Sequence, residues 1–108
     1  MNEFQFVVFS NPVAGRETEY NRWYQEQHLP DVVKVPGVIS AQRCHLADNS
    51  TMAHRYLALY EIKTDNIEAV MQDINGRVGT AEMPMSDALD IEGVAMHVFA
   101  ATGPKVCK

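Results

Sequence analysis

The chain has 108 residues, of which 46% are hydrophobic and 21% are charged, and its formal net charge is −5 at pH 7. This composition is typical of one soluble globular domain spanning 1–108, and it excludes disordered and fibrous chains. The nine Lys and Arg residues are scattered along the sequence, so no nucleic-acid partner is expected.

Localisation is predicted from what the sequence lacks. No apolar run approaches the roughly 20 residues that cross a bilayer, so no membrane partner is expected. Met1-Asn2-Glu3 lacks the basic start of a signal peptide. Two cysteines, Cys44 and Cys107, are too few for a disulfide framework. We expect a cytoplasmic protein.

The first predicted element is a strand over 4–10, because Phe4-Gln5-Phe6-Val7-Val8-Phe9 is rich in aromatic and β-branched residues. Both faces of this strand are apolar, so both should be covered. A helix is predicted over 15–28 from the aromatic spacing, with Pro30 ending or kinking it. His28 lies one turn beyond Tyr24 and is therefore expected on the same face.

Two strands follow the Pro36-Gly37 turn. The first covers 38–46 and places Arg43 and His45 on one face, and the second covers 55–62 and places Tyr56 and Tyr60 on one face.

A second helix should begin at a Thr64 cap, because apolar residues then recur at helical spacing. Gly76 is expected to stop this helix. A loop or short helical turn is predicted over 78–88, and a last strand over 93–101.

The predicted order βαββαβ indicates an α+β, ferredoxin-like fold: a four-stranded antiparallel sheet with two helices on one face. The other face would be left apolar and bare. Pairing two such faces across a two-fold axis would bury them, so we predict a homodimer built as a dimeric α+β barrel.

Three stretches of the sequence resemble the EthD-like family of the dimeric α+β-barrel superfamily. They are Asn21-Arg22-Trp23-Tyr24 with His28-Leu29-Pro30-Asp31, Val35-Pro36-Gly37 with Ala41-Gln42-Arg43, and Tyr56-Leu57-Ala58-Leu59-Tyr60-Glu61. Members of that family include methylmuconolactone isomerases, polyketide cyclases, cofactor-free quinol-type monooxygenases and the EthD accessory protein of ether degradation.

The resemblance implies a pocket in each subunit, between the helix layer and the sheet. It also implies small hydrophobic or aromatic substrates that are handled without a metal or an organic cofactor. Of the isomerase's functional positions, only the helix histidine carries over, and it falls on His28.

His28 is the first candidate catalytic residue, as a general acid or base; the alternative is a histidine that caps a helix C-terminus. Asp31 is a candidate to orient His28, or else a solvated carboxylate. Tyr24 is a candidate to polarise a substrate oxygen, and Trp23 to form an apolar wall, although both fit a core role.

Further candidates for substrate binding come from the strands and the loop. Arg43 and His45 suit an anionic group, with an ion pair from Arg43 to Glu61 as the structural alternative. Tyr56 and Tyr60 suit a carbonyl or enolate, or else the dimer interface. Met83 and His97 complete the set of candidates. No histidine or cysteine spacing predicts a metal site.

These observations predict a small cofactor-independent enzyme of isomerase, cyclase or lyase type, which moves a proton on an aromatic, lactone or polyketide-like metabolite. One alternative is a non-catalytic binding or accessory protein of an EthD-like degradation pathway, and another is a cofactor-free monooxygenase.

Overall fold

The computed structural model describes residues 2–108. Its elements in chain order are β1 (Asn2–Ser10), α1 (Glu17–Trp23), the π-helical turn η1 (Tyr24–His28), α2 (Leu29–Val33), β2 (Val38–His45), β3 (Tyr56–Thr64), α3 (Ile67–Arg77), the 3-10 turn η2 (Ile91–Gly93) and β4 (Ala95–Ala100). Because α1, η1 and α2 follow one another without a break, they form one long helix, and the predicted βαββαβ order is confirmed.

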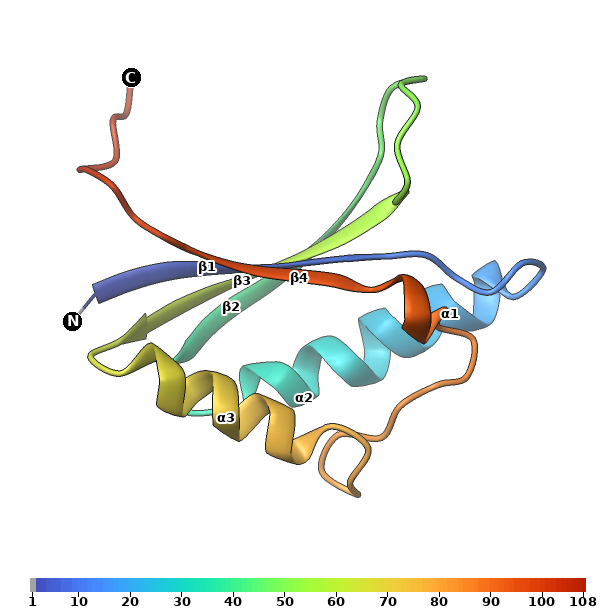
Figure 1. The fold of residues 1–108 in the computed structure, drawn as a ribbon, viewed down its shortest axis with the longest axis horizontal. Coiled ribbons are helices and arrows are strands. Elements are labelled where there is room, and N and C mark those ends of the chain that lie inside the picture. The colour runs from blue at the N-terminus through green and yellow to red at the C-terminus, as the bar shows by residue number, and fades with distance from the viewer. Residues whose placement is uncertain (1) are drawn as a thin grey trace.

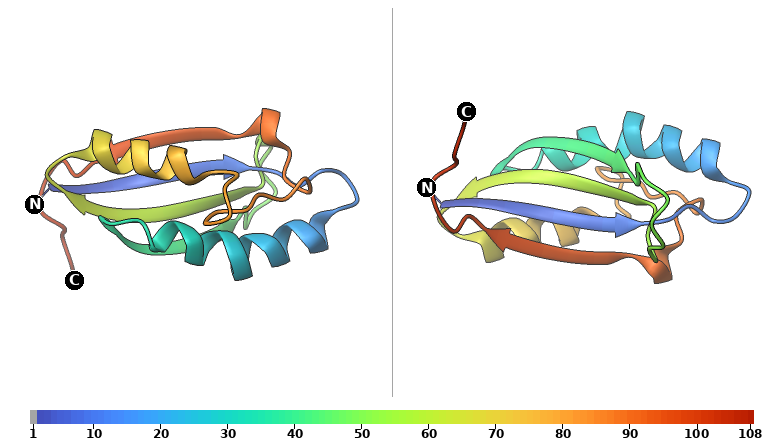
Figure 2. Two further views of the ribbon diagram at one scale, coloured as in Figure 1. Left: turned by 90° about the horizontal axis from the view of Figure 1, so that it is seen from below. Right: turned by 90° about the horizontal axis from the view of Figure 1, so that it is seen from above.

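The four strands form one antiparallel sheet in the order β2-β3-β1-β4. Figure 1 shows that the long helix and α3 lie on the same side of this sheet, and the two views of Figure 2 show that the opposite face is uncovered. This is the predicted ferredoxin-like arrangement. None of the helices among residues 2–108 is long and apolar enough to cross a membrane.

The core fills the space between the helices and the sheet. Phe6 of β1 is paired with Tyr60 of β3, and the two rings stack with centroids 5.5 Å apart. Residues from every layer are buried around them, including Val8, Tyr20, Tyr24, Leu29, Val32, Ala58, Ile62, Val70, Ile74 and Met83.

The long helix contains one turn that is wider than an α-helical turn. The N–H of Leu29 donates to the carbonyl of Tyr24, five residues earlier. In a regular α-helix, Leu29 would lie about 180° away from Tyr20, because nine residues make two and a half turns. Both are nevertheless buried, with 5% and 0% of their surface exposed. The extra residue of the π turn therefore brings both halves of the helix onto the sheet.

Pro30 does not end this helix, so of the two outcomes expected from the sequence, an end or a kink, the first is wrong. Proline has no N–H and so cannot bond to the carbonyl four residues earlier. The π turn over Tyr24–His28 lies directly before Pro30 and already replaces the regular α-helical hydrogen bonds there. The helix therefore continues to Val33.

Both ends of α3 differ from the prediction. The N-cap is Asn66, whose Oδ1 accepts the Ala69 N–H at 3.1 Å. Thr64 instead accepts the N–H of Asn66 at 3.0 Å and so shapes the turn before the helix. At the other end the helix passes Gly76, and Gly79 supplies the positive φ of 81° that reverses the chain.

The segment between α3 and β4 forms a loop over 78–90, without a helical turn in 78–88. It runs between the two helices (Figure 2, left). An isolated bridge from Val78 to Met83 lies within the loop, and another from Pro12 to Leu89 ties the loop to the segment after β1. The 3-10 turn η2 then delays the last strand, which begins at Ala95 instead of Gly93.

The uncovered face of the sheet is mixed rather than uniformly apolar. The strand register places Val7, Phe9, Leu57, Leu59 and Phe99 on it together with Gln5, Gln42, Glu61 and His97. Phe99 is 57% exposed. The homodimer predicted for this face remains a prediction.

Candidate active site

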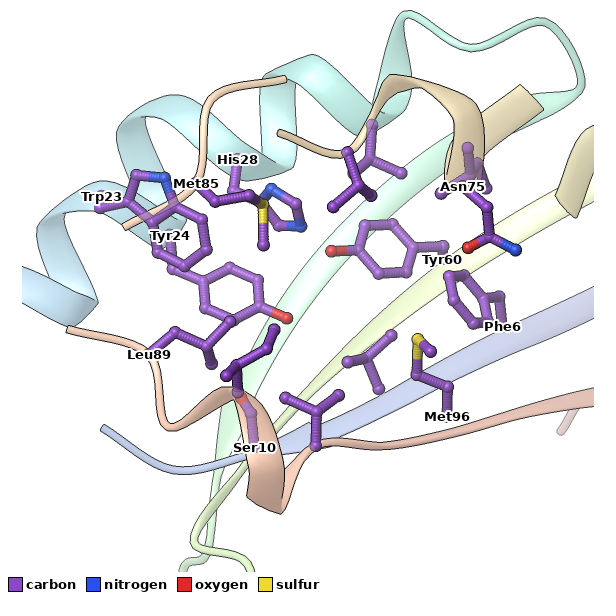
Figure 3. Close-up of a pocket in the computed structure, with 16 residues that line it drawn as sticks. Phe6, Ser10, Trp23, Tyr24, His28, Tyr60, Asn75, Met85, Leu89 and Met96 are labelled. Atoms are coloured by element: carbon purple, nitrogen blue, oxygen red, sulfur yellow. The ribbon is translucent and has the colours of Figure 1, made fainter. Parts of the chain in front are cut away.

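A cavity of about 390 Å³ lies between the helices and the sheet. Its volume is within the range of roughly 300–1,000 Å³ that is usual for small-molecule sites. The lining is mostly apolar, and the polar side chains in it are Ser10, Tyr24, His28, Tyr60 and Asn75, as Figure 3 shows. The remaining lining residues are Phe6, Val8, Trp23, Val32, Ile74, Val78, Met85, Leu89, Ile91, Val94 and Met96.

His28 projects from the helix toward this cavity (Figure 3) and packs against two aromatic rings. It stacks on Trp23 with centroids 4.8 Å apart and meets the Tyr24 ring edge-on at 5.2 Å. Residues five apart lie about 140° apart around a regular α-helix, so the stacking on Trp23 depends on the π turn. Because the helix continues to Val33, His28 is not a C-terminal cap.

The His28 imidazole is neutral at pH 7. Burial lowers its pKa from 6.5 to about 4, and the Asp31 carboxylate opposes this only in part. Its Nδ1 is buried and has no hydrogen-bond partner among the described residues. A neutral imidazole retains one nitrogen lone pair, which is the state that a general base requires.

Two tyrosine phenols face the same cavity, Tyr24 from the helix and Tyr60 from β3, and Figure 3 shows both hydroxyls directed into it. Burial raises the pKa of Tyr24 to about 12 and raises that of Tyr60 well above its ordinary value of 10. The Tyr60 hydroxyl is buried without a hydrogen-bond partner in residues 2–108. Both phenols are therefore protonated at neutral pH and can act as hydrogen-bond donors.

Asp31 does not orient His28. Its side chain is buried, and its carboxylate accepts a hydrogen bond from the Gln27 amide at 2.7 Å and lies 3.7 Å from the Lys34 ammonium. It is not a solvated carboxylate either. Asp31 acts on His28 only through its negative charge, which raises the pKa of the imidazole.

The 78–90 loop closes one side of the cavity and is fastened there by Trp23, whose indole N–H donates to the Pro84 carbonyl at 3.1 Å. The sequence suggested that both methionines of this loop could meet a ligand, with Met83 as the named candidate, and the structure places only Met85 in the cavity lining. Met83 is fully buried in the core instead. The residues on either side of Pro84 thus have different roles, which the sequence did not distinguish.

Four other predicted binding residues lie outside the cavity, and three of them share one pocket. Arg43, His45 and Tyr56 line a separate surface pocket of about 470 Å³ together with Asn21, Gln25 and Cys44. The register places Glu61 on the opposite face of the sheet, so the predicted ion pair with Arg43 does not form. His97 is also on that opposite face, where it pairs with Val7.

Some cavity residues were not predicted from the sequence. Ser10 follows Phe6 and Val8 at the spacing of two that defines one strand face, so this signal was present. Its hydroxyl is hydrogen-bonded to that of Tyr20 at 2.6 Å. Asn75 and Met96 come from α3 and β4, and only the tertiary fold brings them to His28. Among the described residues, no group of three or more His, Cys, Asp or Glu side chains could hold a metal ion.

No protein-family model and no curated protein matches this sequence. Three solved structures match the fold. A MhuD variant with two manganese protoporphyrin IX molecules in each active site has a TM-score of 0.65 at 14% identity, covering 96% of this chain and 99% of that one. A candidate monooxygenase from Shewanella loihica has a TM-score of 0.58 at 13% identity, covering 97% of both chains.

The third match is an ethyl tert-butyl ether degradation (EthD) family protein from Bacillus halodurans. Its TM-score is 0.52 at 12% identity, over 98% of this chain and 100% of that one. This chain shares its fold with an EthD family protein. The α+β fold expected from the EthD-like resemblance is therefore confirmed, whereas identities this low do not transfer an activity.

Proposed function

We propose that the protein is a small enzyme that moves a proton on a hydrophobic carbonyl, lactone or aromatic substrate without a cofactor. The observation that carries the proposal is the combination of a neutral, half-buried imidazole, His28, with two protonated phenols, Tyr24 and Tyr60, in one apolar cavity. A base beside two hydrogen-bond donors is the arrangement that proton abstraction next to a carbonyl needs.

In this mechanism, His28 takes a proton from the carbon beside the carbonyl, and Tyr60 or Tyr24 donates a hydrogen bond to the oxygen as negative charge develops there. The apolar walls exclude water, so these hydrogen bonds are stronger than in bulk solvent. The low pKa of His28 means that its cation is stable only while the substrate anion lies beside it. Return of the proton to another carbon completes an isomerisation. In a ring closure, the enolate carbon instead attacks a second carbonyl carbon of the same substrate, and His28 returns the proton to the alkoxide that forms.

One of the fold neighbours binds a metalloporphyrin, but the described lining of this cavity has no Lys or Arg side chain to pair with the propionates of such a group. The propionates of protoporphyrin IX need cationic partners in an apolar site. A haem therefore has no place in the proposed mechanism.

Hydrogen–deuterium exchange tests the proposal with simple model compounds in place of the natural substrate. Enolisable aromatic ketones and lactones are incubated with the protein in D2O, and loss of the proton next to the carbonyl is followed by NMR. His28→Gln should slow the exchange by about 10²-fold or more, with binding retained as judged by quenching of Trp23. His54→Gln is the control, because His54 bonds to the Gly93 carbonyl and is outside the cavity lining.

Other results would redirect the assignment. Tight binding without exchange above the buffer rate would favour the non-catalytic binding protein. Oxygen consumption with the same compounds would favour a monooxygenase, the activity named for one fold neighbour. An absorbance band on adding haemin that His28→Gln abolishes would contradict the cavity's assignment to a metal-free site.

We also propose that two copies pair through the uncovered sheet face as a homodimer. Support comes from the exposed Phe99 and from the apolar residues Leu57 and Leu59, which lie on the same face. Sedimentation equilibrium of the wild type and of Phe99→Glu tests this. A monomeric wild type would exclude the homodimer.

A further inference from the structure

Arg43 is a half-buried cation that has no carboxylate partner among residues 2–108. Its Nη2 donates to Oδ1 of Asn21 at 2.8 Å and its Nη1 to the Asn21 backbone oxygen at 3.4 Å. The ion pairs found in the described part of the chain do not include it. The sequence holds 14 acidic against nine basic residues, so a shortage of carboxylates does not explain why Arg43 is left without one.

Three tyrosine rings hold the Arg43 guanidinium in place. Its central carbon lies 4.8 Å from the centroid of Tyr24, 5.3 Å from that of Tyr20 and 5.5 Å from that of Tyr56. All three distances are within the roughly 6 Å limit of cation–π contact. These contacts fix the orientation of the cation but do not neutralise its charge, which is a pre-organised state for binding an anion.

The guanidinium also borders open space. Arg43, Asn21, Gln25, His45 and Tyr56 line the surface pocket of about 470 Å³ beside the edge strand β2. A guanidinium has five N–H donors in a planar fork, and Asn21 engages two of them. The fork geometry matches the two oxygens of a carboxylate.

We infer that the Arg43 pocket binds the carboxylate of a small organic anion, at a site separate from the cavity at His28. Arg43 supplies the charge, and the amide of Gln25 and the ring of His45 supply polar contacts around it. The aromatic face of Tyr56 covers the organic part of the ligand. This assignment does not depend on the proposed enzymatic function, because the two sites share none of their described lining residues.

One side chain connects the two sites. Tyr24 contacts Arg43 through its ring while it lines the His28 cavity. Its ring also lies 5.2 Å from that of Trp23, which is the chain's single tryptophan. An anion bound to Arg43 offsets the positive charge next to Tyr24, so occupancy of the pocket should be transmitted to the cavity.

An NMR titration of ¹⁵N-labelled protein tests the site. Sodium benzoate and sodium acetate are added at constant ionic strength, with sodium chloride as the control salt. The expected result is a saturable shift of the Arg43 Nε–H signal and of the backbone amides of residues 21, 25, 43–45 and 56 with the carboxylates only. Because charge-assisted hydrogen bonds are lost, Arg43→Gln should bind at least about tenfold more weakly.

Arg22→Gln is the matched control, because Arg22 is an exposed arginine of the neighbouring helix that pairs with Glu26. It should bind as the wild type does. If Arg43→Gln does not fold, Arg43→Lys and Gln25→Ala take its place: the first keeps the charge without the fork, and both should weaken binding. Absence of saturation, equal shifts with chloride, or shifts confined to the His28 cavity would overturn the inference.

Discussion

The partial burial of His28 makes the stability of the protein depend on pH in a predictable way. Its pKa is about 4 in the folded protein and 6.5 in the unfolded chain. Above pH 6.5 the ring is neutral in both states, and its contribution to stability is complete. Between pH 6.5 and 4 the unfolded chain binds a proton that the folded protein does not, so the free energy of unfolding falls as the pH falls.

The magnitude follows from the two pKa values. Each pKa unit corresponds to about 1.4 kcal/mol, so protonation of His28 in the unfolded chain should cost the folded state up to about 3 kcal/mol by pH 4. Many groups titrate in this range, and the wild type alone cannot separate them. Subtracting the curve of His28→Gln, which has no titrating ring, isolates the contribution of this histidine.

The assay is urea unfolding, followed by circular dichroism between pH 4 and 7.5 at one protein concentration. The unfolding free energy of the wild type minus that of the variant should rise with pH and level off above pH 6.5. His97→Gln serves as a control, because His97 is an exposed histidine on the uncovered sheet face. Parallel curves for the wild type and His28→Gln would refute the claim that His28 is buried in a neutral state.

Three further substitutions or deletions test the framework of the site. Tyr20→Phe leaves the buried Ser10 hydroxyl without its partner and should lower the free energy of unfolding in urea by about 1–3 kcal/mol. The control Tyr56→Phe should lower it less. Equal losses for the two variants would contradict the role of the buried hydrogen bond. Asn66→Ala should lower stability by about 1 kcal/mol and Asn66→Asp should restore most of it, since both polar side chains can cap α3. Deleting Glu26 from the π turn should leave a cooperatively folded protein, destabilised by less than about 3 kcal/mol. The control is deletion of the exposed Gln72, which would rotate half of α3 by about 100° and should prevent cooperative unfolding. Similar outcomes for the two deletions would mean that the π turn does not contain an extra residue that the helix can lose.

The fold was predictable because its signals are local. Short runs of aromatic and β-branched residues marked the strands, and the aromatic spacing of Tyr20 and Tyr24 marked the helix that covers the sheet. The cap of α3 was misplaced by two residues, because Thr64 and Asn66 are both good caps and only the backbone geometry decides between them. The ion pair of Arg43 with Glu61 was wrong because it depends on the register between two strands, which pairs Arg43 with Ala58 and leaves Glu61 on the other face.

The candidate site was predictable only in part. Trp23, Tyr24, His28 and Tyr60 could be found because each is a polar or aromatic residue on a face directed at the core. The stacking of His28 on Trp23 could not be predicted, because contact between residues five apart requires a π turn and does not follow from the 3.6-residue period of a regular helix. The loop around Pro84 carries no periodic pattern, so the sequence could not show that Met85 lines the cavity while Met83 is buried in the core.

The π turn has a consequence for comparing this chain with others. In a relative whose helix lacks the extra residue, the part of the helix after the turn is displaced by one position in any alignment without a gap. The residue matched to His28 would then be its neighbour in sequence rather than its counterpart in space. Gaps are rarely placed inside helices, so correspondences across Tyr24–His28 should be drawn from superposed backbones, and a histidine shifted by one column should not be counted as absent.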